Sequence, residues 1–207
     1  MTSTKTSTNT NNSQNYHHGN LREALLIDGL RLLESSEGAN FSMRELTRMI
    51  GVSANAVYRH FKSKEELLVA LAIQGFQSLL EQQALAIQNA KTAQEGFLNS
   101  GKTYIDFAIK NPSLFRLMYG RFAVNQNDES LNSLAQLAYT GILYSASTAL
   151  NLDVNSQHAK TIATSSWGVV HGLSHLIIDG QFNAMSAQQL NEMIDTIIEG
   201  LYSSQIK

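Results

Sequence analysis

The chain has 207 residues, 43% hydrophobic and 15% charged, with a formal net charge of −2, values typical of a globular protein. It contains no cysteine, which excludes a disulfide framework and a thiolate metal site and suits a reducing cytoplasm. It has no run of 18 apolar residues and no apolar leader, so neither a transmembrane helix nor secretion is expected. With one proline, at position 112, and few runs that alternate like strands, the chain is predicted to be all-α.

The N-terminal segment is polar, and a helix is expected to follow it. Residues 1–15 are almost entirely Thr, Ser, Asn and Gln, so we expect a disordered tail. From about Asn20, leucines recur on one side of a predicted helix that would support the elements after it: Leu21, Leu25, Leu26, Leu30 and Leu33. His17, His18 and Arg22 lie where contact with a nucleic-acid backbone is plausible. Two adjacent histidines on a flexible segment seldom converge on one metal ion.

A short helix is predicted from Ser42 to Ile50. Ser42 followed three residues later by Glu45 is the pattern of a capping box, which marks a helix start. One apolar stripe follows, formed by Leu46, Met49 and Ile50. Gly51 comes directly after that stripe, where a left-handed residue ends a helix.

A second short helix and the start of a third complete the pattern. Ser53 is placed to cap a helix whose apolar positions are Ala56, Val57 and Phe61. Ser63 and Glu66 form another capping-box pattern at the start of the third helix. Two short helices joined by a glycine-containing turn are the helix-turn-helix signature, here at about residues 42–61. Such a unit places its second helix in the DNA major groove.

The charges of this region favour DNA binding. Between Phe41 and Lys64 a local charge of +4 arises from five cations against Glu45: Arg44, Arg48, Arg59, Lys62 and Lys64. Cations clustered on one surface neutralise phosphates. Tyr58, His60 and Lys64 add donors that suit phosphates rather than bases. The alternative is an ordinary helical hairpin with a solvated basic face.

The remaining sequence predicts a long helix and then a helical bundle. The long helix runs from Ser63 to about Asn89 and is amphipathic. Five further helices are predicted at about 92–110, 112–120, 129–150, 156–180 and 186–203. Pro112 fits the first turn of its helix, and Ser186 with Gln189 gives one more capping-box pattern.

The bundle is rich in aromatic residues and methionine, which favours a cavity for a small molecule. Tyr and Trp combine an apolar ring with a hydrogen-bonding group, as ligand cavities require. The candidates are Phe97, Tyr104, Phe107, Phe115, Met118, Tyr119, Phe122, Tyr139, Tyr144 and Trp167. The alternative is that these side chains only fill the core.

One predicted helix carries Trp167, His171, His175 and Asp179 at intervals of four residues, which places them on one face. Two histidines at this spacing could bind one metal ion, with Asp179 as a third ligand. A straight helix does not bring all three to one ion, so a structural or ligand-lining role is favoured. A metal- or His-dependent enzyme that uses His171, His175 and Asp179 is the alternative function.

The last two predicted helices have the composition of a helix–helix interface. Small residues allow close approach in the first of them: Ala159, Ala163, Ser165, Ser166, Gly168 and Gly172. The last helix carries a broad apolar stripe formed by Leu190, Met193, Ile194, Ile197, Ile198 and Leu201. These helices would form a four-helix bundle with their copies across a twofold axis, or they pack within one subunit. Dimerisation is favoured because helix-turn-helix proteins read half-sites about 34 Å apart.

Three segments resemble the tetracycline-repressor (TetR) family over about residues 16–80: YHHGNLREALL, MRELTRMIGVSANAVYRHF and AVYRHFKSKEELL. The resemblance implies that Tyr58, His60 and Lys64 contact phosphates and that Phe61 is a core residue. It also implies that the long helix connects the DNA-reading unit to the bundle and that ligand binding changes its tilt.

The segments WGVVHGLSHLIIDGQF and NPSLFRLMYG resemble the Trp-His-Gly subclass of that family. In this subclass the helix that carries Trp167 and His171 packs at the dimer interface and lines the ligand cavity. The family uses this half of the chain to bind small, mostly apolar effectors, and that favours the cavity.

The prediction is therefore a dimeric transcriptional repressor, not an enzyme, in the bacterial cytoplasm and on the nucleoid. We expect a tail (1–15), a helix-turn-helix DNA-binding domain (16–79) and an effector-binding and dimerisation domain (80–207). The expected partners are an operator duplex, a second copy and a small apolar or aromatic effector, without cofactor, metal or membrane. A helical adaptor that does not bind DNA is a further alternative.

The sequence predicts two sets of site residues. The DNA-binding candidates are Ser42, Arg44, Ser53, Ala54, Asn55, Tyr58, Arg59, His60, Lys62 and Lys64. The ligand-binding candidates are Phe97, Tyr104, Phe107, Phe115, Met118, Tyr119, Tyr139, Tyr144, Trp167 and His171.

Overall fold

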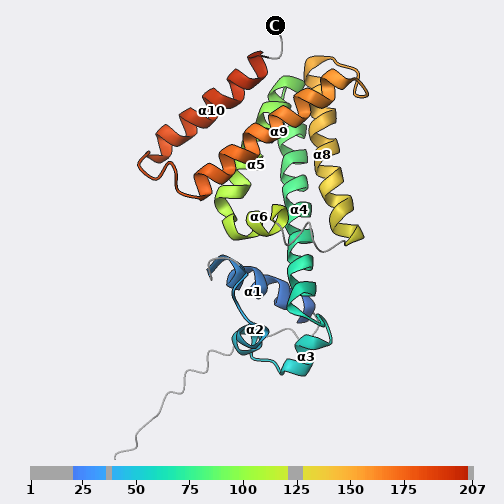
Figure 1. Ribbon diagram of the computed structural model, residues 1–207, viewed down its shortest axis with the longest axis vertical. Helices are drawn as coiled ribbons and strands as arrows, with labels where there is room; N and C mark the ends of the chain where they lie inside the picture. Colours follow the sequence, from blue (N-terminus) through green and yellow to red (C-terminus); the bar gives the residue numbers. More distant parts are fainter. Residues whose placement is uncertain (1–20, 36–38, 121–127, 205–207) are drawn as a thin grey trace, which may run out of the picture.

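The computed structural model describes residues 21–35, 39–120 and 128–204, and every regular element in these ranges is a helix. The N-terminal half contains α1 (Leu21–Ser35), α2 (Met43–Ile50), α3 (Ala54–Tyr58) and the long α4 (Lys64–Gln88). Figure 1 shows α1, α2 and α3 gathered at one end of α4, whose other end runs into the second group of helices. The predicted all-α fold is confirmed. The predicted disordered tail, His17 and His18 lie outside the described residues.

The C-terminal half is a helical bundle. It consists of α5 (Ala93–Lys110), α6 (Pro112–Tyr119), α8 (Glu129–Leu150), α9 (Gln157–Ile178) and α10 (Ala187–Ser204). α5 is its centre, because it packs against α4, α8, α9 and α10, while the short α6 lies against α4 and α1 (Figure 1). No helix in the described ranges is long and apolar enough to cross a membrane.

Side-chain caps decide where the short N-terminal helices begin. The Ser42 hydroxyl accepts from the Glu45 amide at 3.2 Å, and the Glu45 carboxylate accepts from the Ser42 amide at 2.6 Å, which confirms the capping box. Gly51 ends α2 with a φ of 75°, the left-handed conformation that glycine adopts without strain. The predicted capping box at α4 is half present. The Ser63 hydroxyl accepts from the Glu66 amide as expected, but the Glu66 carboxylate accepts from the Lys62 amide instead of the Ser63 amide.

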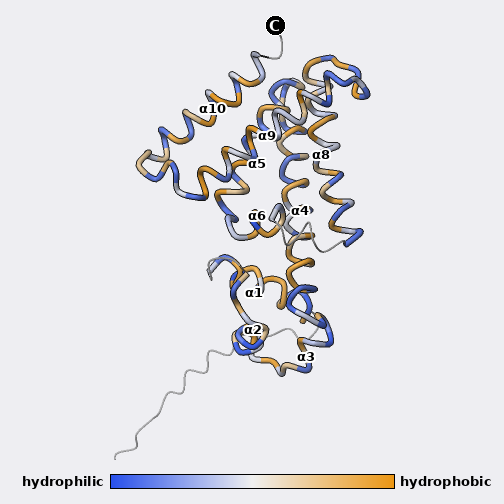
Figure 2. Tube along the Cα trace, in the orientation of Figure 1, coloured by the Kyte–Doolittle hydropathy of each residue, from blue (hydrophilic) through white to orange (hydrophobic). Residues whose placement is uncertain are grey.

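The three N-terminal helices share one apolar core, and α3 is shorter than predicted. Val57 and Phe61 are buried, although α3 ends at Tyr58 and Phe61 follows it in a turn. Of the three residues of the predicted stripe, Leu46 is buried and Ile50 is partly buried against the core, but Met49 is 46% exposed and does not belong to it. Met43 and Leu46 form the buried side of α2 instead, because a helix of eight residues can turn only one narrow face to the core. In Figure 2 hydrophilic stretches gather at α2 and at the start of α4.

A carboxylate joins the two halves of the molecule. Glu34, in the last turn of α1, accepts hydrogen bonds from the backbone amides of Ser113 at 3.0 Å and Leu114 at 2.9 Å, in the first turn of α6. Asn111, at the N-cap of α6, forms no side-chain cap. The Glu34 carboxylate therefore caps the N-terminus of α6, although Glu34 is distant from α6 in the sequence. Its negative charge lies at the positive end of the α6 dipole.

α6 is also fixed to α4 and to α9. The Gly75 position on α4 faces α6 so closely that a Cβ atom would lie 2.5 Å from Met118 Sδ and 3.1 Å from Leu114 Cγ. On its other side, the Arg116 guanidinium donates to the Asp179 carboxylate at 2.5 Å, beside the end of α9. α6 is therefore held by α1, α4 and α9 at once.

We expect Gly75→Leu to lower the free energy of unfolding by about 1–3 kcal/mol, because the side chain would push α6 away from α4. Gly141→Leu is the matched control, since a Cβ at Gly141 in α8 meets nothing within 4 Å. The control should leave stability unchanged or raise it by about 0.5–1 kcal/mol through helix propensity. Urea unfolding of both variants measures the difference, and equal stabilities would contradict the close packing of α6 on α4.

Candidate nucleic-acid interface and internal cavity

Nine of the ten predicted DNA-contacting residues have exposed side chains on or beside α2 and α3: Ser42, Arg44, Ser53, Ala54, Asn55, Tyr58, Arg59, His60 and Lys62. The hydroxyls of Ser42 and Ser53 already cap α2 and α3. The side chains of Arg44, Asn55 and His60 form no hydrogen bond with the described residues, so their donors face solvent. The structure therefore presents one polar, cation-rich surface at this end of the molecule.

Lys64 is the exception among these residues, because its side chain is half-buried. Its ammonium group donates to the Ala39 carbonyl and lies 4.9 Å from the centre of the Phe41 ring. An ammonium has three N–H donors, so two remain for another partner. On the same unit, the Arg22 guanidinium lies 5.2 Å from the centre of the Phe61 ring. Sequence spacing placed both cations near the interface but did not reveal these contacts with aromatic rings.

Glu45 is the single acidic residue between Phe41 and Lys64, and its carboxylate binds the start of α2. Hydrogen bonds from the backbone amide and hydroxyl of Ser42 hold the pKa of Glu45 below its ordinary value. Its negative charge therefore lies at the N-terminus of α2, which is the positive end of the helix dipole. The net charge of the surface stays positive, because the cations outnumber this one carboxylate.

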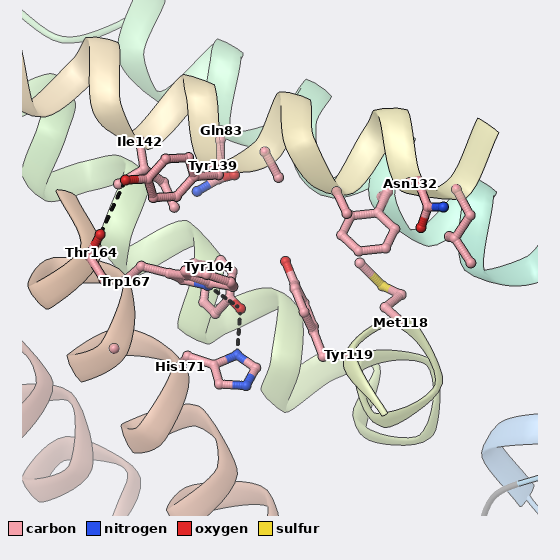
Figure 3. Close-up of a pocket in the computed structure, with 15 residues that line it drawn as sticks. Gln83, Tyr104, Met118, Tyr119, Asn132, Tyr139, Ile142, Thr164, Trp167 and His171 are labelled. Carbon is pink, nitrogen blue, oxygen red and sulfur yellow. Dashed lines mark hydrogen bonds between the residues drawn. The ribbon is translucent and has the colours of Figure 1, made fainter. Parts of the chain in front are cut away.

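The bundle contains a cavity of about 530 Å³ that is partly open to solvent, and α4, α5, α6, α8 and α9 each contribute an aromatic ring to its wall. These rings belong to Phe76, Tyr104, Tyr119, Tyr139 and Trp167. Figure 3 labels the last four of them. The other wall residues are Gln83, Met118, Leu131, Asn132, Ala135, Ala138, Ile142, Thr164, Gly168 and His171. The volume is within the range of small-molecule sites.

Six of the ten predicted ligand-binding residues line this cavity: Tyr104, Met118, Tyr119, Tyr139, Trp167 and His171. Phe107 and Phe115 are buried in the core and do not reach its wall. Phe97 lines a smaller neighbouring hollow, and Tyr144 is 58% exposed on α8, away from both hollows. Phe122 lies outside the described residues.

Sequence reasoning missed several wall residues. Phe76 is one of them, and it lies on the apolar side of the long helix, where it has the pattern of an ordinary core residue. Gln83 is another, a polar residue in that helix with only 9% exposure, whose amide donates to the backbone oxygen and the hydroxyl of Ser100 at 3.2 and 3.1 Å. A glutamine among apolar neighbours in a long helix was the available signal.

A chain of hydrogen bonds crosses the cavity wall. The Trp167 indole donates to the Tyr104 hydroxyl at 3.2 Å, and that hydroxyl lies 2.8 Å from His171 Nδ1 (Figure 3). Burial raises the pKa of Tyr104 and raises that of Tyr119 to about 12, so both phenols stay protonated. Burial and the neighbouring His175 lower the pKa of His171, which favours its neutral form. Neutral His171 therefore shares a hydrogen bond with the Tyr104 hydroxyl through Nδ1.

The predicted row of His171, His175 and Asp179 has two different environments. The rings of His171 and His175 lie 4.7 Å apart. Asp179 is paired with Arg116 at 2.5 Å and follows the last turn of α9. Within the ranges that the structure describes, no group of three His, Cys, Asp or Glu side chains is arranged to hold a metal ion.

Comparison with known proteins places both halves in one family. The sequence matches the family profile described as "Bacterial regulatory proteins, tetR family" over residues 27–71. It matches "Tetracyclin repressor-like, C-terminal domain" over residues 97–201, which is more than half of the chain. The nucleoid occlusion factor SlmA of Vibrio vulnificus is 30% identical over 119 residues, which cover 57% of this chain and 61% of that protein. The chain thus aligns with about three fifths of the length of these curated relatives.

Solved structures share the fold. A Rhodococcus sp. RHA1 protein described as having unknown function is 26% identical with a TM-score of 0.81, covering 94% of this chain and 100% of that one. A tetR-family regulatory protein from Rhodococcus RHA1 is 17% identical with a TM-score of 0.62, covering 87% and 94%. With both profiles matched, the chain belongs to the tetracycline-repressor family of bacterial DNA-binding transcriptional regulators.

Proposed function

We propose that the protein is a dimeric repressor that binds a palindromic operator and leaves it when a small molecule enters the cavity. The observation that carries the proposal is that one helix, α4, serves both sites. Its N-terminal end follows the cation-rich surface of α2 and α3, and Phe76 and Gln83, further along it, line the cavity. Operator binding would place the protein on the nucleoid of a bacterial cytoplasm.

The exposed residues of α2 and α3 divide into two groups on the operator. Asn55, in the first turn of α3, is the candidate for direct readout, since its amide can pair with adenine in two hydrogen bonds. Arg44, Ser53 and Ala54 would lie at the groove or its rim. Tyr58, Arg59, His60, Lys62 and Lys64 would contact phosphates, which fix position but carry no sequence information.

The dimer would form through α9 and α10. The exposed side of α9 carries Gly168, which also lines the cavity, Gly172 and Leu176; a Cβ at either glycine would meet nothing within 4 Å of this subunit, and Leu176 is 47% exposed. α10 packs mainly on α5 through Ile194 and Ile198 and leaves Leu190, Met193 and Ile197 only half-buried. Small and apolar side chains on neighbouring helices suit a twofold interface of four helices.

We further propose that α6 transmits occupancy of the cavity to the DNA-reading unit. Met118 and Tyr119 at one end of α6 belong to the cavity wall, and the amides at its other end bind the Glu34 carboxylate of α1. A ligand that displaces Tyr119 would thus move a helix that is fixed to α1 and α4. The two reading heads would then change their spacing, and the operator affinity would fall.

The proposal is tested by binding to duplexes taken from the regions upstream of the neighbouring genes, at two salt concentrations. Specific and salt-sensitive binding by a dimer supports it, because phosphate contacts release counterions. If one short palindrome does not compete better than random DNA of equal length, the repressor assignment fails.

Lys62 and Lys64 are expected to differ in one property only. Both Lys62→Ala and Lys64→Ala should weaken operator binding. Each should also reduce the slope of the logarithm of the binding constant against the logarithm of the salt concentration by about one. Lys64→Ala should also lower the free energy of unfolding by about 1 kcal/mol, because Lys64 binds the Ala39 carbonyl. Lys62→Ala is the control, since its exposed side chain forms no hydrogen bond or ion pair with the residues that the structure describes. Equal unfolding curves for the two variants would contradict the structural role of Lys64.

Glu34→Gln is expected to weaken coupling rather than DNA binding. The amide oxygen can accept from one α6 amide but lacks the charge that favours the helix N-terminus. Operator affinity without ligand should stay within about threefold of wild type, and a compound that releases wild type from the operator should release the variant less. Asp106→Asn is the control, because Asp106 is exposed and has no partner among the described residues. An unchanged release curve for Glu34→Gln would exclude this route.

A further inference from the structure

A small hollow adjoins the cavity and contains a buried hydroxyl without a partner. The two spaces share Gln83, Tyr104, Ile142 and Trp167 as wall residues, and the smaller one, which we call the annex, measures about 30 Å³. Ser166 lines the annex, is only 5% exposed, and its hydroxyl has no hydrogen-bond partner within the described part of the chain. Because a buried hydroxyl without a hydrogen bond is costly, Ser166 points to a polar partner at this position.

A second unused group lies in the same wall. The amide nitrogen of Gln83 donates to Ser100, but its Oε1 accepts no hydrogen bond from any residue that the structure describes. Gln83 lines both spaces and Ser166 lines the annex, so the pair supplies one unused acceptor and one unused donor to the adjoining spaces. A hydroxyl group, which donates and accepts once each, is the simplest partner for such a pair, and the annex has room for about one group of that size.

The cavity beside the annex selects against charge. Its wall residues in the described ranges include no Asp, Glu, Lys or Arg. Burial and His175 lower the pKa of His171, which favours its neutral form, and its Nδ1 is already hydrogen-bonded to the Tyr104 hydroxyl. A charged ligand would lose its hydration here and gain no opposite charge.

Aromatic rings surround the rest of the space and suit a flat ligand. Tyr139 and Trp167 lie 6.2 Å apart, Trp167 and Tyr119 lie 6.3 Å apart, and Tyr119 and Phe76 lie 5.2 Å apart, measured between ring centres. Figure 3 shows Tyr139 on α8 near Trp167, and the Tyr119 ring projecting from α6 toward α8. Rings at these separations contact one another and form a continuous aromatic wall, against which an aromatic ligand can pack by offset or edge contacts.

We propose that the cavity takes an uncharged, planar aromatic molecule whose terminal hydroxyl enters the annex and binds Ser166 and Gln83. The proposal rests on the proposed effector role of the cavity and specifies the ligand class and its orientation. Trp167 lines both spaces and is the one tryptophan of the sequence, so its fluorescence reports occupancy at this position.

The test compares three compounds of one shape: 4-hydroxyazobenzene, azobenzene and azobenzene-4-carboxylate. They absorb where tryptophan emits, so quenching of Trp167 measures their binding to the full-length protein at neutral pH, without DNA. We expect the hydroxyl compound to bind roughly threefold to tenfold more tightly than azobenzene, the effect of a buried hydrogen bond. We expect the carboxylate to bind at least about tenfold more weakly than the hydroxyl compound.

Ser166→Ala should abolish the preference for the hydroxyl compound and leave the affinity for azobenzene within about twofold of wild type. Ser147→Ala is the matched control, because Ser147 is the other buried serine in the described ranges with an unpartnered hydroxyl, and it lines neither space. The control should keep the wild-type preference. Because the readout compares two compounds on the same variant, a change in overall stability does not produce the expected result.

Three results would overturn the proposal: tight binding of the carboxylate, an intact hydroxyl preference in Ser166→Ala, or no quenching by any of the compounds. These results leave the operator assay untouched. If the hydroxyl compound binds as expected but does not release the operator, the ligand class stands and the proposed release mechanism fails.

Discussion

The contact between Glu34 and the first turn of α6 is the constraint on which the arrangement of the two halves depends. The first turn of any helix presents amides without intrahelical partners, and α6 has no side chain of its own to cap them. The carboxylate satisfies two of these amides and places a negative charge at the positive end of the helix dipole. α6 is therefore positioned by α1, although 79 residues separate Glu34 from Ser113 along the chain.

The same short helix is part of the cavity wall. Its last residues, Met118 and Tyr119, face the cavity, and the glycine at position 75 allows α6 to lie directly on α4. A packed core transmits a displacement because it has little free volume to absorb one. The proposed response to a ligand uses this property. A displacement of Tyr119 would move α6, and α6 would pass the movement to α4 through the contact at Gly75 and to α1 through Glu34.

The electrostatics of the two ends are opposite in kind. The α2–α3 surface has exposed cations and a single acidic group that is fixed at the start of α2. The cavity is lined by neutral groups, and its polar side chains are mostly bonded to one another, as in the chain from Trp167 through Tyr104 to His171. One end therefore suits a polyanion, and the other suits an uncharged molecule.

Several features follow from local sequence, and the structure confirms them. Caps at Ser42, Ser53 and Ser186, the glycine that ends α2 and the proline that begins α6 act over a few residues, so their patterns predicted the helix boundaries closely. The resemblance identified the family, which the profile matches confirm. The exposure of the α2–α3 side chains also follows from helix periodicity, with Met49 as the failure.

The tertiary structure decided which apolar side chains meet the cavity and which meet the core. Periodicity shows that Phe107, Phe115 and Tyr119 belong to apolar faces, but the packing of neighbouring helices determines that Tyr119 alone of the three lines the cavity. The same holds for the bond from Gln83 to Ser100, the bond from Glu34 to α6 and the position of Ser166 in the annex, since each depends on residues that are distant in sequence. Local sequence specifies where a helix begins and which side is apolar. Contacts between helices depend on the whole chain, because the position of each helix is fixed by several others at once.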